Sequence, residues 1–201
     1  MFDVVSIIKT AGYLGVCAII FAESGLLIGF FFPGDSLLFT AGVLSSAGFL
    51  DIRILVPLVF LSAVLGDNTG YYLGRKAGEK FFQREESFFF KKSRVEKAKE
   101  FFEKHGQRSI ILARFVPVVR TFVPTVAGVA QMEYRSFFYA NMIGGALWAC
   151  GLPLLGYLLG QTVPNIDQYL LPIVAVIILV SFLPVIKIWL ESRNNETLPK
   201  K

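Results

Sequence analysis

The sequence predicts an all-α, polytopic membrane protein, because its apolar content is high and its apolar residues gather in long runs. Apolar residues make up 54% of the 201 residues and aromatic residues 14%, whereas soluble domains contain about 45–50% apolar residues. Four runs approach the ~20 residues that a helix needs to cross the hydrocarbon core of a bilayer. We therefore expect four transmembrane helices, over residues 1–22, 55–74, 137–160 and 169–190.

Two further apolar segments, 23–50 and 109–130, are interrupted by proline and glycine. Proline removes a backbone donor and clashes within a helix, so each segment should break near its middle. The arms of the second segment would be about ten residues, or ~15 Å, which is half the hydrocarbon thickness. Both segments are therefore predicted to be re-entrant helical hairpins that turn within the membrane. The breaks are expected at Pro33, Gly34, Pro117 and Pro124.

The distribution of charge predicts how the chain is oriented. Segment 75–108 carries 11 Lys or Arg against 6 Glu and has an amphipathic pattern, so we expect it to lie on the cytoplasmic face. Its position between apolar runs favours a membrane surface over a nucleic acid as its partner. The loop 161–168 contains no basic residue, whereas the tail 191–201 contains three, which predicts an external loop and a cytoplasmic tail.

These orientations determine the side from which each hairpin enters. Segment 109–130 must return to the cytoplasmic side, and segment 23–50 must then enter from the outside. Both termini are predicted to be cytoplasmic, and residues 1–201 to form a single membrane domain. Opposed broken segments indicate an inverted repeat, the plan of many secondary transporters. Irregular backbone at membrane depth is tolerated only where it is buried in protein or lines a wet cavity, so we expect the hairpins to line the functional site.

Five charged residues lie within the apolar segments 23–50, 55–74 and 109–130. Each charge at the centre of a bilayer costs about 2.5–3.5 kcal/mol, so these residues must pair, meet water or meet a ligand. If the hairpins meet, the acids of the first converge with the arginines of the second. A set of buried salt bridges and a ligand site both remain open from the residues alone. The five are Glu23, Asp35, Asp67, Arg114 and Arg120.

The chemistry of these residues suits a phosphate and a proton. Arg114 and Arg120 carry planar donor forks that match phosphate oxygens, and we assign them to binding of a headgroup. Glu23 and Asp35 are assigned to proton coupling or to ion pairing with the arginines, because a buried carboxylate can carry a proton. Which of the two acids does so is left open. Supporting polar roles, such as hydrogen bonds between helices, are expected for Asp67, Asn68 and Asn141.

The sequence argues against an enzyme and against a metal site. His105 is the only histidine and lies in the basic segment, where it cannot build a histidine-rich metal centre or serve as a membrane-embedded base. Asp35 in PGD and Asp67 in LGD are similar to the paired aspartates of intramembrane aspartyl proteases, but the tyrosine-aspartate partner motif is missing. We expect no catalytic residue and no cofactor. A membrane protein that acts through a partner and a small ion channel remain as rival interpretations.

Five motifs together resemble the DedA family, also called the SNARE-associated or VTT-domain family. The resemblance covers roughly residues 15–160. Its motifs are FAESG at 21–25, FFPGDSLL at 31–38, GDNTGYYLGRKAG at 66–78, RFVPVVRTFVPTVAG at 114–128 and NMIGGALW at 141–148.

This resemblance implies two opposed re-entrant hairpins and transport of lipid. Bacterial members resemble carriers of undecaprenyl phosphate or phospholipid, and eukaryotic relatives resemble scramblases. For this chain it implies a flippase of the bacterial cytoplasmic (inner) membrane, driven by the proton motive force, with a passive scramblase as the alternative. It associates Glu23 and Asp35 with proton dependence, and Arg114 and Arg120 with the headgroup. The implied partners are membrane lipids and protons, and a homodimer is left open.

Overall fold

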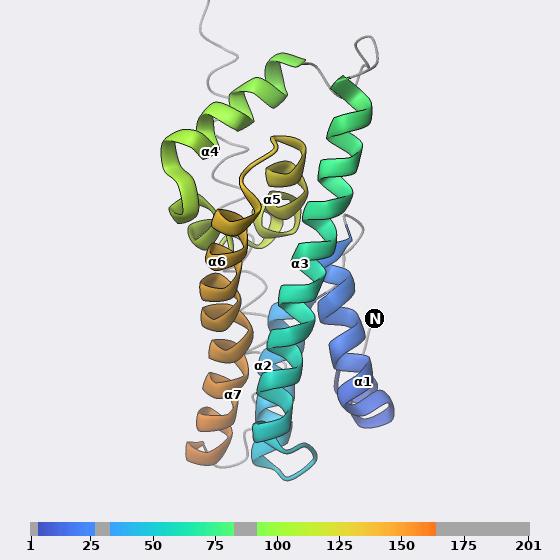
Figure 1. The fold of residues 1–201 in the computed structure, drawn as a ribbon. Helices are drawn as coiled ribbons and strands as arrows, with labels where there is room; N and C mark the ends of the chain where they lie inside the picture. The colour runs from blue at the N-terminus through green and yellow to red at the C-terminus, as the bar shows by residue number, and fades with distance from the viewer. Residues whose placement is uncertain (1–3, 27–32, 83–91, 164–201) are drawn as a thin grey trace, which may run out of the picture.

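The computed structural model describes residues 4–26, 33–82 and 92–163, and these residues form helices with no strand among them. The predicted span 169–190 and the tail 191–201 lie outside this described part. Figure 1 shows the helices packed into an elongated bundle. They are α1 (Val4–Gly25), α2 (Gly34–Ser46), α3 (Ile52–Phe82), α4 (Lys92–Ala113), α5 (Pro117–Val129), α6 (Tyr134–Gly145) and α7 (Gly151–Thr162), with one π-helical turn (Ala146–Cys150) between α6 and α7.

Two long antiparallel rods run along the bundle (Figure 1). One is α3, and the other is the continuous helix Tyr134–Thr162 that joins α6, the π turn and α7. Within the described residues, Ile52–Gly78 and Tyr134–Thr162 are the helices that are long and apolar enough to cross a membrane, which confirms the spans predicted at 55–74 and 137–160. The apolar part of α1, Ala11–Gly25, is shorter.

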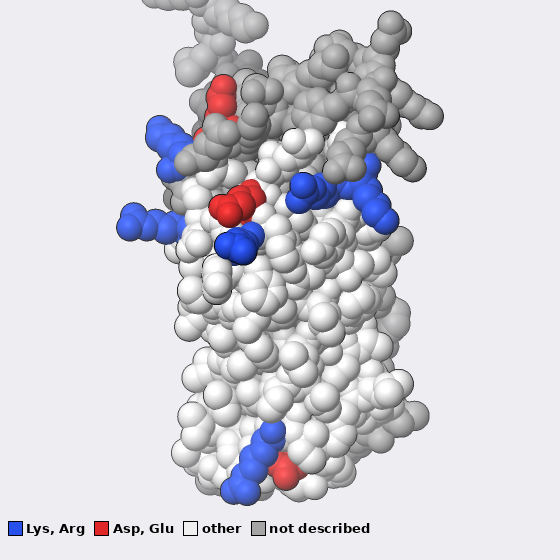
Figure 2. Space-filling model, in the orientation of Figure 1, with Lys and Arg blue, Asp and Glu red and all other residues white. Residues whose placement is uncertain are grey.

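The charged side chains are confined to the two ends of the visible surface. Figure 2 shows a wide band without Lys, Arg, Asp or Glu between these ends, on the face in view. Many large apolar side chains in the bundle are exposed, including Leu65, Leu147 and Leu155 at 54–57%. An exposed apolar band between charged ends is what a lipid environment requires.

The chain repeats one order of helices in its two halves. Each half begins with a helix of 22 residues that is kinked at a glycine (Gly12 in α1, Gly106 in α4), continues with a helix of 13 residues and ends in a long rod. The kinked helices α1 and α4 pack on the rod of their own half, whereas the short helices α2 and α5 pack on the rod of the other half. Since the rods are antiparallel (Figure 1), this is the arrangement that an inverted repeat requires.

The exchanged short helices approach the rods at glycines. A Cβ atom at Gly74 of α3 would overlap the backbone of Thr125 in α5, and one at Gly156 of α7 would overlap the backbone of Phe39 in α2. Small residues let helix backbones come close in membranes, where packing rather than the hydrophobic effect drives association. These contacts hold the two halves together.

Both predicted breaks are present, but only one of the two prolines named for the second break lies at it. In the first segment, α2 begins at Gly34 directly after Pro33. In the second segment, α4 ends at Ala113 and α5 begins at Pro117, the first helical position, where the missing N–H of proline costs nothing. The break predicted at Pro124 is wrong, because α5 runs through this residue. Neighbouring helices can compensate for the single hydrogen bond that such a proline removes. The re-entrant depth of the two segments stays a prediction.

Two boundaries near the basic segment also differ from prediction. Helix α3 continues past residue 74 to Phe82, and α4, which bends at Gly106, continues past the expected boundary between residues 108 and 109 to Ala113. Lys, Arg and Glu are good helix formers, so a change from apolar to charged residues marks the edge of an apolar region and not the end of a helix.

We predict that Gly156→Ala lowers the stability of the protein by about 1–3 kcal/mol, because the added methyl group overpacks the contact between α2 and α7. Thermal unfolding of the purified protein in detergent measures this effect. The matched control is Gly151→Ala in the same helix, where a Cβ meets no atom within 4 Å and stability should not fall. Equal melting temperatures for the two variants would contradict the close approach.

Candidate functional site

The charged residues predicted in the broken segments lie at the broken ends of the helices. Glu23 is in the last turn of α1 and Asp35 in the first turn of α2. Arg114 follows the last residue of α4, and Arg120 is near the start of α5. The positive end of the helix dipole at the start of α2 favours the negative charge of Asp35. Each break therefore contributes two charges of one sign to the region where the two halves meet.

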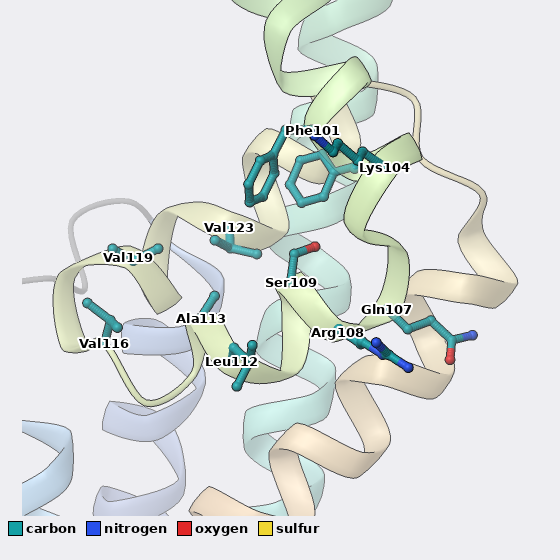
Figure 3. Close-up of a pocket in the computed structure, with 11 residues that line it drawn as sticks. Phe101, Lys104, Gln107, Arg108, Ser109, Leu112, Ala113, Val116, Val119 and Val123 are labelled. Atoms are coloured by element: carbon teal, nitrogen blue, oxygen red, sulfur yellow. The ribbon is translucent and has the colours of Figure 1, made fainter.

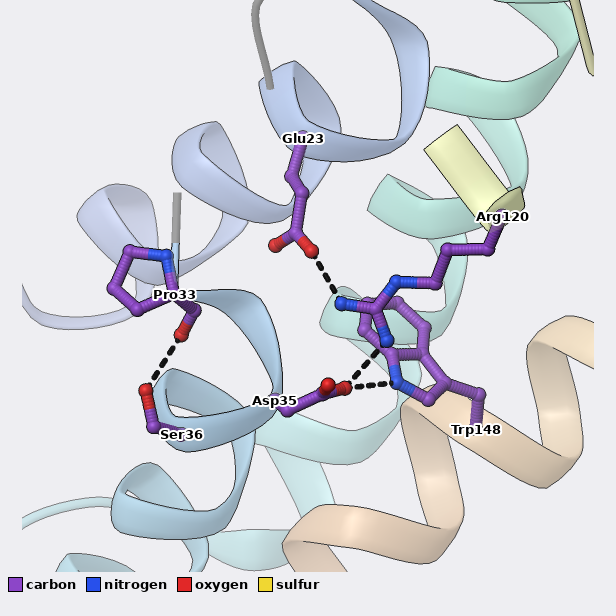
Figure 4. Close-up of polar contacts among 6 residues, drawn as sticks. All are labelled: Glu23, Pro33, Asp35, Ser36, Arg120 and Trp148. Atoms are coloured by element: carbon purple, nitrogen blue, oxygen red, sulfur yellow. Dashed lines mark hydrogen bonds and ion pairs between the residues drawn. The ribbon is translucent and has the colours of Figure 1, made fainter. Parts of the chain in front are cut away.

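Arg120 connects the two halves through two carboxylates (Figure 4). Its Nη2 forms an ion pair with Glu23 Oε1, and its Nη1 donates to Asp35 Oδ1 at 2.5 Å. The side chains of Arg120, Glu23 and Asp35 are 9%, 3% and 17% exposed. The predicted convergence of opposite charges is thus confirmed for these three residues, and each nitrogen of the guanidinium fork binds a different acid.

Trp148 completes this group from the π-helical turn. Its indole Nε1 donates to Asp35 Oδ1 at 2.7 Å, and its ring centre lies 4.3 Å from the guanidinium carbon of Arg120. The same ring is 5.7 Å from the guanidinium carbon of Arg114. An aromatic ring at such distances attracts a cation, and π turns are frequent at functional sites. Sequence reasoning did not assign Trp148 to the site, since a tryptophan in an apolar helix usually packs or anchors.

Arg114 belongs to a second, fully buried group. Its Nη2 forms an ion pair with Asp67 of α3 and donates to Asn141 Oδ1 of α6 at 2.5 Å. The amide of Asn141 donates in turn to the carbonyl of Val64 at 3.3 Å. A Cβ at Gly144 would lie 3.1 Å from Arg114 Cδ, so the glycine leaves room for the arginine stem. Asp67 and Asn141, predicted as supporting polar residues, therefore neutralise and orient Arg114.

Asn68, the other predicted supporting residue, shares the carbonyl of Val64 with Asn141. Its Oδ1 accepts a hydrogen bond from the Tyr134 hydroxyl at 3.1 Å, and its Nδ2 donates to the carbonyl of Val64 at 2.7 Å. Asn68 thus joins α3 to the start of α6, a structural role that polar residues often have between membrane helices.

The charges of the cluster do not balance when all groups are ionised. Arg114 and Arg120 face three carboxylates, Glu23, Asp35 and Asp67, so the described cluster carries one negative charge in excess. Glu23 Oε2 is buried and has no hydrogen-bond partner among the described residues. An unsatisfied buried carboxylate oxygen is costly, and a proton on Glu23 would remove the excess charge of the cluster.

The cluster is closed in this structure. A cavity of about 10 Å³ lies among Asp67, Arg114, Arg120, Pro124 and Phe137, which is at most the space of one water molecule. A Cβ at Gly34 would overlap the carboxylate of Glu23, so the start of α2 lies directly against the end of α1. The cavity beside the arginines therefore has no room for a phosphate in this structure.

Comparison with protein families matches residues 32–158 to the VTT domain. The chain belongs to the DedA family of membrane proteins. Glu23 lies before the matched residues. The match includes the other members of the charge cluster and its contacts, namely Asp35, Asp67, Arg114, Arg120, Asn141 and Trp148.

Several relatives support membership of the DedA family. The chain is 48% identical to the uncharacterized membrane protein Rv0364 of Mycobacterium tuberculosis over 172 residues, which cover 85% of this chain and 75% of the relative. It is 46% identical to Protein DedA of Escherichia coli K12 over 168 residues (83% and 76%), and 35% identical to the inner membrane protein YqjA of the same strain over 150 residues (75% and 68%). No solved structure matches this chain. Two of these names state a membrane location, and none of them states a substrate.

We predict that Asp67 and Arg114 are energetically coupled. Removing one partner of a buried ion pair leaves the other charge uncompensated and costs about 3–5 kcal/mol. Asp67→Ala and Arg114→Ala should each lower the free energy of unfolding. The double variant should lower it by about 1–3 kcal/mol less than the sum of the two single effects. The free energy of unfolding is measured in detergent for the wild type, the two single variants and the double variant.

The control for this cycle is a pair of exposed arginines, Arg53 and Arg135. Their alanine variants should change the free energy of unfolding very little, and the two effects should add. Additivity within error for Asp67 and Arg114 would contradict the assigned ion pair.

Proposed function

We propose that this DedA-family protein carries a lipid with a phosphate headgroup across the membrane, and that Arg120 and Arg114 bind the phosphate. The observation that supports this function most strongly is the position of Arg120. This residue bridges Glu23 and Asp35 beside Trp148, where the broken ends of both halves meet. A buried cation that joins two separable units is suited to exchange one anion for another.

A phosphate can take the place of the carboxylates without leaving Arg120 unpaired. The two guanidinium nitrogens that bind Glu23 and Asp35 form the planar fork that also binds two phosphate oxygens. An unpaired buried charge costs several kcal/mol, so α1 and α2 can leave Arg120 at low cost only when another anion replaces them. In this proposal, arrival of the headgroup and opening of the cluster are one event.

Protons supply the second half of the exchange. Glu23 and Asp35 lose Arg120 when the phosphate binds, and as buried anions they would then be uncompensated. Uptake of protons neutralises them and keeps the phosphate on the arginine, whereas loss of these protons restores the ion pairs and releases the lipid. A proton gradient across the membrane would therefore give the cycle a direction.

The proposed lipids are undecaprenyl phosphate or a phospholipid, both of which present the same phosphate chemistry to the arginines. The proposed location is the bacterial cytoplasmic membrane, with both termini in the cytoplasm, where a gradient of protons is available. A passive scramblase would use the same binding step without the proton cycle, and a protein that acts through partners would use neither.

We predict that Arg120→Ala abolishes movement of a fluorescent phosphatidic acid across reconstituted vesicles, and that Arg120→Lys slows it about 10- to 100-fold, because lysine lacks the second charge-assisted hydrogen bond. The control is Arg135→Ala, an exposed arginine, which should transport at the wild-type rate. Correct insertion is checked by a single monodisperse species in detergent. Unchanged transport in both Arg120 variants would refute the phosphate site.

The same vesicles distinguish a proton-coupled carrier from a scramblase. Transport by the wild type should follow the sign of an imposed pH gradient, and Glu23→Gln or Asp35→Asn should remove this dependence. A wild type that is indifferent to the gradient but still needs Arg120 would favour passive scrambling. A wild type that moves no lipid under either condition would favour action through partners.

A further inference from the structure

A large hollow lies beside the charge cluster, between the bend of α4 and the helix α5 (Figure 3). Its volume is about 760 Å³, within the range of pockets that hold small organic ligands. The bend arises at Gly106, whose φ of 52° and ψ of −137° suit glycine alone. The parts of α4 before and after this bend, here called its first and second arms, line two sides of the hollow. Helix α5 lines another side.

The floor of the hollow is apolar. It is formed by Phe101 and Phe102 from the first arm of α4, Leu112 from the second arm, and Val119 and Val123 from α5. Leu112 is 67% exposed, so the apolar floor continues onto the surface of the bundle. An apolar hollow that continues onto the lipid-facing surface of the protein can receive a hydrocarbon chain from the surrounding lipid.

The rim of the hollow is basic. Lys104 and Arg108 line it and are exposed, and Gln107 and Ser109 add uncharged polar groups. No Asp or Glu is among the described residues that line it. Two cations above an apolar floor complement an anionic headgroup with an attached chain better than they complement a peptide helix or a neutral lipid.

The hollow adjoins the charge cluster. Ala113 and Val123 line both the hollow and the small cavity beside Arg114 and Arg120. One layer of small side chains therefore separates the two spaces. Because the shared residues belong to the apolar part of the hollow, a lipid bound there would lie next to the arginines before the cluster opens.

We propose that the hollow binds a membrane lipid with a phosphate headgroup, its phosphate at Lys104 and Arg108 and its chain on Phe102, Val119 and Val123, as the site from which the lipid reaches the arginines. This assignment rests on the proposed function for its role in transport. Binding in the hollow itself is measurable without transport.

The test uses the full chain in phosphatidylcholine vesicles that contain a small fraction of phosphatidic acid with a photoactivatable diazirine on its acyl chain. After irradiation, mass spectrometry of peptides should find adducts concentrated between residues 101 and 123. Val119→Trp, which fills the hollow, should remove most of these adducts. Leu158→Trp, at a site on α7 that is 55% exposed, is the matched control and should leave their yield unchanged.

The headgroup is tested separately. The double variant Lys104→Gln with Arg108→Gln should lower the yield about 10- to 30-fold, since each basic side chain near an anionic lipid contributes about fivefold. A diacylglycerol probe with the same diazirine, which lacks the phosphate, should give few adducts in this region. Equal labelling by the two probes, or labelling spread over all exposed apolar surfaces, would overturn the proposal. Absence of adducts at 101–123 would also overturn it, because another segment of the chain or a second copy would then cover the hollow.

Arg120→Ala separates this inference from the proposed function. If both hold, this variant keeps the adducts and loses transport. Transport by the wild type without adducts would refute only the hollow. Adducts together with full transport by Arg120→Ala would refute only the role of the arginine.

Discussion

A buried guanidinium between two carboxylates is the constraint on which the rest of the structure depends. Arg120 of α5, Glu23 of α1 and Asp35 of α2 come from segments far apart in the chain, and none can be left alone in an apolar bundle without a cost of several kcal/mol. Each break must therefore be positioned so that its charges meet those of the other break. Trp148 connects this group to the second rod, because its indole binds Asp35 while its ring lies against Arg120.

The exchanged packing of the short helices makes this meeting possible. Helix α2 packs on the rod of the second half and α5 on the rod of the first half, through glycines that bring backbones into contact. The charged ends of both short helices consequently face one another between the rods. Buried ion pairs contribute little net stability, so packing holds the fold together and the ion pairs select its closed arrangement. An arrangement selected by charge can be shifted by a proton or by a competing anion.

Much of this architecture could be predicted because charges in apolar segments must be compensated. The two long spans, the break at Pro33 and the convergence of Arg120 with Glu23 and Asp35 follow from that requirement and from apolar length. The pairing of Arg114 with Asp67 could not be predicted, since their separation in the chain does not indicate which acid is nearer. Nor could the role of Trp148, because its contacts depend on a π turn that has no distinctive sequence pattern. Pro124 misled the prediction, since its effect on α5 depends on neighbouring helices.

The central claim is that a phosphate replaces the carboxylates on Arg120 and that the carboxylates then take up protons. Infrared difference spectroscopy of the protein in vesicles, recorded before and after addition of phosphatidic acid, observes both forms of a carboxyl group. Glu23→Gln and Asp35→Asn assign the bands to their residues. We predict that the lipid lowers the band of ionised carboxylate and raises that of protonated carboxyl, and that each variant loses the part of both changes that its residue contributes. Binding of the lipid with no change in either band would contradict it.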